Sequence, residues 1–179
     1  MSNQNYLEII VPIRLDTKWH QSLVKDLAAV SKNIDWQRKG IHHQTLVFIK
    51  DGSQVNQLKT EFKKMQDKFK PITLTLDKLE AFTTVNGDKH IVCLTSSQPS
   101  DKLLELANEV RACAECIGAN YDKRPFKLHV TLCKIPSDEV SLEEVKTILD
   151  KIQLPQFACC LRDIQYRYLG GRRIYLRNR

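Results

Sequence analysis

The chain has 179 residues, enough for one domain or for two small lobes that share a core. Its apolar fraction of 42% and charged fraction of 27% are those of an ordinary globular protein, and no run approaches the ~20 apolar residues of a membrane span. The formal net charge of +7 favours anionic partners without identifying them.

The N-terminal residues do not follow the pattern of a signal peptide. They are polar from Ser2 to Asn5, and the apolar stretch that follows is short and interrupted by Pro12. We therefore expect a cytoplasmic protein with no membrane partner, in which the six cysteines are reduced thiols. Cys113 and Cys116 form a C-x-x-C pair inside a helical pattern with no second pair at zinc spacing, so we interpret them as helix packing.

The first half of the chain alternates between strand and helix patterns. Trp19, Leu23, Leu27 and Val30 recur at helical spacing, with Asp16 or Thr17 as N-cap. The elements expected here are a strand at 6–13, this helix, a loop at 36–40, a strand at 41–49, a helix at 55–69 and a strand at 72–77, which residues 79–84 extend or pair with.

The second half repeats this order. Asn86-Gly87 predicts a hairpin turn, Ser100 and Ser141 have the positions of helix N-caps, and Gly118 suits a helix C-terminus. His90, next to the hairpin turn, is expected to face solvent. The elements expected here are a strand at 90–95, a helix from 100 to about 117, a strand around 128–133, a helix from 141 to about 152, a long strand at 157–168 and, after the Gly170-Gly171 turn, a final strand at 172–176.

Two of the strands contain the same motif, His-x-Thr-Leu, inside an apolar run. Side chains alternate along a strand, so His43 and Thr45 share one face of the first copy, while Leu46 and Phe48 are expected on the other. Each copy therefore offers an imidazole and a hydroxyl on one face. Two imidazoles that face one cleft would serve as general acid and general base, and two hydroxyls beside them would donate to a phosphoryl oxygen.

In the second copy, His129 and Thr131 share a face, and the apolar neighbours take the other. Both motifs lie at equivalent points of the repeated element order. We therefore predict one α+β domain over 1–179, built from two lobe-like repeats at about 5–84 and 88–177. A pseudo-two-fold would relate two antiparallel-rich sheets, with helices outside and a central cleft between them.

These motifs resemble those of the 2H phosphoesterase superfamily, and most closely its RNA 2′,3′-cyclic phosphodiesterase / 2′-5′ RNA ligase branch. The run Arg124-Pro125-Phe126-Lys127-Leu128-His129-Val130-Thr131-Leu132-Cys133-Lys134 carries most of the similarity, and Trp36 before the first motif also fits. The resemblance covers essentially the whole chain in element order. Two departures are Leu128, where the family often has Pro, and Lys134, where it usually has Arg.

Lys134 lacks the bidentate fork of an arginine. Strict alternation also places it on the core face, so it would serve the site only if the strand ends or twists before it. His42 faces away from the cleft by the same parity, and we interpret it as structural.

The resemblance implies a metal-free and cofactor-free enzyme whose partners are RNA ends or cyclic nucleotides. We expect a monomer, although the sequence itself does not show the oligomeric state. It would open a 2′,3′-cyclic phosphate to a 2′-phosphomonoester. By similarity His43 is the proton donor and His129 the acceptor, although the sequence itself is too symmetric to choose. Thr45 and Thr131 would hold the non-bridging oxygens, and Arg124 and Lys134 would bind the phosphate.

Three alternatives stay open. The same histidines would also serve cleavage of 2′-5′-linked oligonucleotides, in which the substrate's own 3′-OH takes the place of water, or their ligation. The chain would otherwise be a non-catalytic module that binds nucleotides or RNA ends, or a metal site made of His42, His43, Cys93 and Cys133. The arginine-rich C-terminus is either a solvated edge or a nucleic-acid contact; its arginines are Arg162, Arg167, Arg172, Arg173, Arg177 and Arg179.

Overall fold

The computed structural model describes residues 5–98, 100–168 and 173–175, which form four helices and ten strands. No helix within these ranges is long and apolar enough to span a membrane. The predicted Gly170-Gly171 turn and the expectations for Arg172, Arg177 and Arg179 lie outside the described residues, as does the side chain of Arg173.

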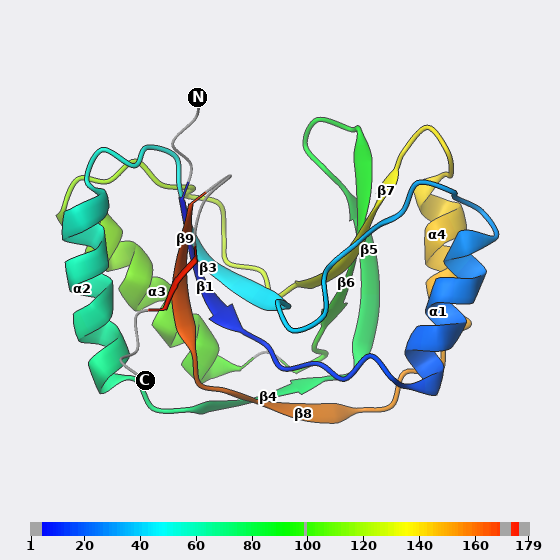
Figure 1. The fold of residues 1–179 in the computed structure, drawn as a ribbon, viewed down its shortest axis with the longest axis horizontal. Coiled ribbons are helices and arrows are strands. Elements are labelled where there is room, and N and C mark those ends of the chain that lie inside the picture. The colour runs from blue at the N-terminus through cyan, green and yellow to red at the C-terminus, as the bar shows by residue number, and fades with distance from the viewer. Residues whose placement is uncertain (1–4, 99, 169–172, 176–179) are drawn as a thin grey trace.

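One lobe is an antiparallel sheet of four strands in the order β10-β9-β1-β3. Helices α2 and α3 lie beside it, on the left of Figure 1. The bounds are β1 (Asn5–Ile10), β3 (His43–Ile49), β9 (Ile164–Tyr168), β10 (Arg173–Tyr175), α2 (Val55–Lys68) and α3 (Asp101–Cys116).

The other lobe is an antiparallel sheet in the order β2-β7-β6-β5. Helices α1 and α4 pack together outside it, on the right of Figure 1. The bounds are β2 (Asp35–Trp36), β5 (Lys78–Thr83), β6 (Lys89–Thr95), β7 (Val130–Pro136), α1 (Lys18–Ala28) and α4 (Leu142–Leu149).

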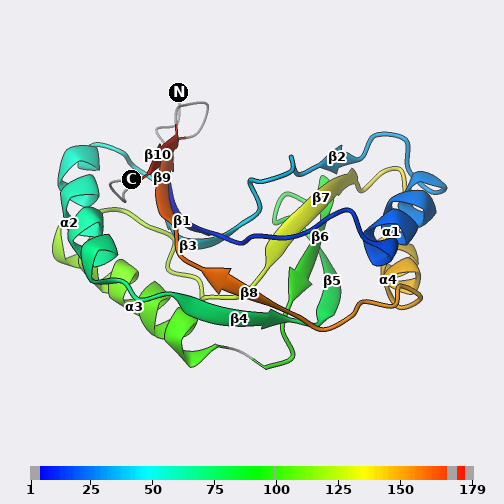
Figure 2. The same ribbon diagram turned by 60° about the horizontal axis from the view of Figure 1, so that its bottom comes forward.

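A two-stranded sheet joins the lobes. Its strands β4 (Ile72–Leu76) and β8 (Phe157–Leu161) pair antiparallel, and they cross from one lobe toward the other in the foreground of Figure 2. The predicted α+β fold of two pseudo-symmetric antiparallel lobes with outer helices is therefore correct.

The lobes exchange strands. β5 follows the first-half elements along the chain yet pairs with β6, and β9 follows the second-half elements yet pairs with β1. Each four-stranded sheet therefore combines strands from both halves of the sequence. The division into repeats at about 5–84 and 88–177 follows the order of elements along the chain and stays a prediction. The two four-stranded sheets do not coincide with those two segments.

Local signals placed most helix ends correctly. The Oγ of Ser100 accepts a hydrogen bond from the Leu103 N–H at 3.3 Å, and the Oγ of Ser141 accepts one from the Glu144 N–H at 3.2 Å. Gly118 follows α3 with φ of 68°, the left-handed conformation that terminates a helix. Thr17 precedes α1 but makes no side-chain cap bond.

Several strand expectations were wrong. The predicted strand 157–168 breaks at Arg162 and Asp163 into β8 and β9, which belong to different sheets. Trp36, expected in a loop, belongs to β2 and pairs with Cys133 of β7. These outcomes depend on pairing with distant strands, which local patterning does not encode.

His90 is buried, with 5% of its surface exposed, where the sequence suggested a solvent-facing residue. Its Nε2 donates to the Val140 carbonyl at 3.0 Å, which leaves Nδ1 to accept from the Thr83 hydroxyl at 3.0 Å. Both ring nitrogens are satisfied inside the fold, so His90 is structural.

Candidate active site

A β-bulge interrupts the first motif strand. Leu7 of β1 pairs with Val47 and the next residue, Glu8, pairs with Thr45, so Leu46 has no partner on β1. A bulge adds one residue and reverses the alternation beyond it. Phe48 therefore lies on the same face as Thr45, and both line the same pocket, whereas simple alternation predicted opposite faces.

The second motif strand carries a bulge at the equivalent residue. Val92 of β6 pairs with Cys133 and Cys93 pairs with Thr131, which leaves Leu132 without a partner. Lys134 is exposed and pairs with Ile91, which lines the central pocket. The bulge thus provides the shift that brings Lys134 to the cleft face.

On the cleft face of each lobe, paired residues of three neighbouring strands lie side by side in a row, and the rows of the two lobes correspond. In the first lobe, Thr45 lies beside Glu8, whose other neighbour is Gln165 on β9. In the second lobe, Thr131 lies beside Cys93, whose other neighbour is Glu80 on β5. Directly opposed residues of neighbouring strands place their side chains on the same face.

The next row outward is aromatic in the first lobe. Tyr6 lies between Phe48 and Arg167, with ring centroids of Tyr6 and Phe48 4.8 Å apart and the Arg167 guanidinium 4.4 Å from the Tyr6 centroid. The corresponding row of the second lobe holds Phe82, Ile91 and Lys134. Aromatic rings thus stand on both lobes beside the motif residues.

Both motif histidines are held in the same way. Nδ1 of His43 lies 2.9 Å from the Ile41 carbonyl, and Nδ1 of His129 lies 2.9 Å from the Lys127 carbonyl, in each case two residues earlier. A carbonyl can only accept, so each Nδ1 carries a proton. Each ring therefore presents Nε2 as the nitrogen available for proton transfer.

Gln44 connects the two motif strands. This side chain, 1% exposed, extends from β3 so that its Oε1 accepts from the His129 backbone N–H at 2.7 Å. Its Nε2 donates to the carbonyls of Thr45, at 2.8 Å, and Lys127, at 3.3 Å. One amide thereby fixes the separation of the two motifs.

A pocket of about 630 Å³ lies between the lobes, and Thr45 and His129 line it, whereas His43 and Thr131 are not among its lining residues. Its volume is in the usual range for a small-molecule site. Its other residues are aromatic or cationic in large part, and they include Tyr6, Phe48, Phe82, Arg111, Arg124 and Lys127. A pocket with this composition suits an anionic ligand that carries flat rings.

Burial is the main cause that lowers the pKa of His129. The positive charges of Lys127, His43 and Arg124 act in the same direction, against the hydrogen bond to the Lys127 carbonyl. The charge of His43 is felt at His129, so the two imidazoles lie close enough to interact. The Phe82 ring meets the His129 ring edge to face, with centroids 5.6 Å apart.

His43 has a partner that His129 lacks among the described residues. Its Nε2 lies 3.1 Å from Oε1 of Glu8, a carboxylate with 0% exposure. Arg167 also contacts that oxygen, at 2.8 Å from Nε and 2.7 Å from a terminal nitrogen. Gln165 donates to Oε2 at 2.8 Å.

The predicted phosphate-binding residues lie at the edges of the site. Arg124 lines the pocket, but its guanidinium is bound to Asp122, with Nε 2.8 Å from Oδ2. This pairing holds the pKa of Asp122 below its usual range. Lys134 shares the cleft face but does not line the pocket itself.

His42 is buried at 2% exposure, and burial lowers its pKa to about 4, with the charges of His43 and His20 adding to the effect. Its full burial, beside the half-buried His43, agrees with the predicted opposite parity of the two residues. Within the described part of the chain, no three His, Cys, Asp or Glu side chains are grouped as metal ligands. The four residues of the metal alternative, His42, His43, Cys93 and Cys133, therefore do not form a ligand set.

Sequence reasoning missed Glu8, Arg167 and Arg111. Glu8 occupies an apolar strand pattern in which a charged residue is unexpected, and that mismatch was the available signal. Arg167 is one of the arginines for which the sequence left a solvated edge or a nucleic-acid contact open, whereas its side chain is bound to Glu8 and lies over the Tyr6 ring. Arg111 lines the pocket from α3, and its Nε is buried with no hydrogen-bond partner in the structure.

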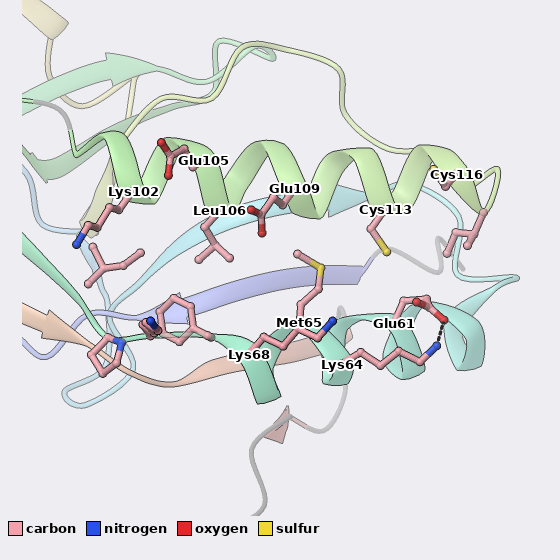
Figure 3. Close-up of a pocket in the computed structure, with 15 residues that line it drawn as sticks. Glu61, Lys64, Met65, Lys68, Lys102, Glu105, Leu106, Glu109, Cys113 and Cys116 are labelled. Atoms are coloured by element: carbon pink, nitrogen blue, oxygen red, sulfur yellow. Dashed lines mark hydrogen bonds and ion pairs between the residues drawn. The ribbon is translucent and has the colours of Figure 1, made fainter.

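A second hollow of about 830 Å³ lies between α2 and α3. Figure 3 shows Met65, Leu106 and Cys113 directed into it, with charged side chains along both helices. It contains none of the motif residues, so the candidate site is the pocket between the lobes.

Each lobe carries one His-x-Thr motif at the beginning of a strand, with His43 as the first residue of β3 and His129 directly before β7, although the predicted strand 128–133 included it. The sequence model described as "2'-5' RNA ligase superfamily" matches residues 17–165. The chain therefore belongs to the 2′-5′ RNA ligase superfamily. No curated protein matches it in sequence.

Solved structures share the fold over nearly the whole chain. Escherichia coli LigT in complex with 3′-AMP is 20% identical with a TM-score of 0.58, over 98% of this chain and 94% of that one. Kluyveromyces marxianus Usb1 with uridine monophosphate is 14% identical with a TM-score of 0.59, over 97% of this chain and 98% of that one. A structure described only as a phosphoesterase is 19% identical with a TM-score of 0.58, over 98% and 94%. These likenesses show a shared fold over nearly the whole chain.

Proposed function

We propose that the protein opens 2′,3′-cyclic phosphates of RNA ends or nucleotides to 2′-phosphates, without a metal ion. The observation that carries this proposal is the identical hydrogen bond from each motif histidine to a carbonyl two residues earlier. Nδ1 of each ring is thereby engaged, and Nε2 is the nitrogen left to exchange a proton, with Nε2 of His43 beside the Glu8 carboxylate. Two such imidazoles satisfy the requirement for one acid and one base.

In the proposed reaction, water attacks the phosphorus of the cyclic diester while the bond from phosphorus to O3′ breaks. His129 takes a proton from the water, and His43 gives a proton to the departing O3′. The product is a 2′-phosphomonoester with a free 3′-OH, so one water is consumed and no other reactant is needed. Burial lowers the pKa of His129, which favours the neutral ring that a base requires.

Charge that develops on the non-bridging oxygens would be met by the hydroxyls of Thr45 and Thr131. Both are half-buried and lie in matching rows of the two lobes. Arg111, Arg124 and Lys127 make the pocket positive, which supports binding of an anionic substrate. The nucleotides in the LigT and Usb1 complexes belong to those proteins, and their chemistry is consistent with the substrate class proposed here.

The aromatic rings favour a second candidate function. Tyr6 and Phe48 stand on one lobe and Phe82 on the other, and all three line the same pocket. Base stacking on both sides would suit a substrate with a nucleoside on each side of the phosphate. That arrangement supports the alternative of 2′-5′ phosphodiester cleavage or ligation by the same histidines.

The test is turnover of 2′,3′-cyclic nucleotides and of 2′-5′-linked dinucleotides in the presence of EDTA. The proposal expects hydrolysis of the cyclic substrates in EDTA, with phosphorus and proton NMR placing the phosphate on the 2′ oxygen. A 3′-phosphate product, or activity only after a metal is added, would contradict it. Preferential cleavage of the dinucleotides would favour the second candidate.

A further inference from the structure

Glu8 is an acidic residue placed where the proposed acid must hold its proton. It is fully buried in β1, and its carboxylate contacts His43, Arg167 and Gln165. A buried carboxylate is stable only when hydrogen bonds and opposite charge compensate it. Arg167 and the Gln165 amide nitrogen can only donate to it, so Glu8 is compensated in its ionised form.

The hydrogen-bond inventory of His43 determines its charge in this arrangement. Nδ1 faces the Ile41 carbonyl at 2.9 Å, and Nε2 faces the Glu8 carboxylate at 3.1 Å. Both partners are acceptors, so both contacts are hydrogen bonds only when each ring nitrogen carries a proton. The imidazolium form of His43 is therefore the one that fits the free protein.

The residue equivalent to Glu8 in the second lobe carries no charge. Glu8 lies beside Thr45, and the matching neighbour of Thr131 is Cys93. Burial raises the pKa of the Cys93 thiol to about 12, so it is neutral at physiological pH. The site is thus symmetric in its motifs and asymmetric in the residue beside each threonine, with a carboxylate near one histidine and a thiol near the other.

Arg167 moderates this pairing. Both of its close nitrogens contact the oxygen of Glu8 that also faces His43, so one carboxylate oxygen is shared by two cations. The other titratable groups that act on the same region are His42 and His129, whose pKa values the charge of His43 helps to lower. With Arg167 and His43 both charged, the cluster around Glu8 has one net positive charge, which suits an arriving phosphodiester.

We propose that Glu8 is a positioning residue that keeps His43 protonated in the free protein and so makes His43 the acid, while Arg167 weakens that pair enough for the proton to be released. This inference rests on the proposed function for its catalytic meaning. The substrate's leaving oxygen would replace the Glu8 carboxylate as the acceptor of the Nε2 proton. Glu8 would then act on the free enzyme more than on the enzyme–substrate complex.

The first test follows the titration of the His43 ring nitrogens by NMR in the free protein, which does not depend on turnover. Glu8→Gln should lower the midpoint at which His43 loses its proton by roughly one pH unit or more, as expected for loss of a contacting opposite charge. Arg167→Gln should raise that midpoint, because Glu8 would then pair with His43 alone. Glu80→Gln is the control, since this β5 carboxylate contacts Lys78 and Lys127 in the other lobe, and it should leave His43 unchanged.

The second test is the pH profile of kcat/KM, which reports the free enzyme, against that of kcat, which reports the complex. In Glu8→Gln the alkaline limb of kcat/KM should move to lower pH, with a smaller movement in kcat and an unchanged acid limb. A uniform loss of activity at every pH would indicate a structural role and overturn the proposal.

Unchanged His43 titration in both Glu8→Gln and Arg167→Gln would also overturn the proposal. If Glu8→Gln does not fold, the upward shift expected in Arg167→Gln still decides the matter. If the NMR midpoints shift as expected while no cyclic phosphate is hydrolysed, the proposed function fails and the role of Glu8 in setting the charge of His43 stands.

Discussion

The amide of Gln44 accepts a hydrogen bond from the backbone of His129, with Oε1 2.7 Å from the His129 nitrogen. Gln44 lies between His43 and Thr45 in sequence, and it is buried. The Gln44 Nε2 also donates to the Lys127 carbonyl, and the same carbonyl accepts from Nδ1 of the His129 ring. Placement of one motif therefore depends on a residue inside the other.

Gln44→Leu should remove this connection. The buried His129 N–H would lose its partner, at a cost of about 1–3 kcal/mol in the free energy of unfolding. It should also lower kcat, because the two imidazoles would no longer be held at a fixed separation. Denaturant unfolding and steady-state kinetics measure the two effects.

Gln66→Leu is the matched control. Gln66 is a buried glutamine whose Oε1 accepts the Ile164 N–H at 3.0 Å, and it lies on α2 outside the pocket. It should lose similar stability with kcat nearly unchanged. Equal losses of kcat in both variants would show that Gln44 contributes only to stability.

His43→Ala and His129→Ala should each lower kcat by about 10²- to 10⁴-fold, the usual contribution of general acid–base catalysis. The double variant should be little worse than either one, because the acid and base act as a unit. Quench assays with a cyclic mononucleotide provide the rates. Near-full turnover in both single variants would refute the catalytic assignment.

The two histidine variants should differ in stability. His43→Ala removes a donor from the fully buried Glu8, so it should cost roughly 1–3 kcal/mol of unfolding free energy. His129→Ala should cost less than about 1 kcal/mol, since its ring faces the pocket and bonds only a carbonyl beside it. Thermal and denaturant unfolding would show this order, and equal losses would contradict the Glu8 contact.

Thr45→Val and Thr131→Val keep the strand shape and remove only the hydroxyl. Each should lower kcat by less than the histidine variants do, because a lost hydroxyl weakens charge stabilisation without removing proton transfer. KM should change little if the hydroxyls act mainly as charge develops. A larger rise in KM than fall in kcat would instead place the threonines in ground-state binding.

Phe82→Ala should change the pH profile. Burial is the main cause of the lowered pKa of His129, and the Phe82 ring covers it edge to face. Opening this side to water should raise the pKa of His129 toward 6.5, so the acid limb of kcat/KM should move to higher pH. An acid limb that stays in place would show that another group titrates there.

His42 links stability to pH. Its pKa is about 4 in the folded protein and 6.5 in a model peptide, so the unfolded chain binds the proton more tightly. Stability should therefore fall as pH drops from about 6.5 to about 4, with a contribution of roughly 3 kcal/mol. His42→Gln should flatten the urea-unfolding curve of stability against pH in that window, and an unchanged slope would refute the assignment.

The sequence by itself determined the parts that depend on neighbouring residues. The His-x-Thr-Leu motifs, the stripes of the helices and the caps at Ser100 and Ser141 rest on interactions within a few positions of each other. Because these interactions are local, the order of residues along the chain is sufficient to predict the motif pair and the family that it indicates.

The tertiary structure decided which residues meet across the chain. Bulges at Leu46 and Leu132 turn Phe48 and Lys134 toward the cleft, and they arise from register with β1 and β6. The contact of Glu8 with His43 and Arg167 joins three strands that are distant in sequence. The symmetric motifs contain no sign of it, because the charge of a buried group is set by its surroundings in three dimensions and not by its neighbours along the chain.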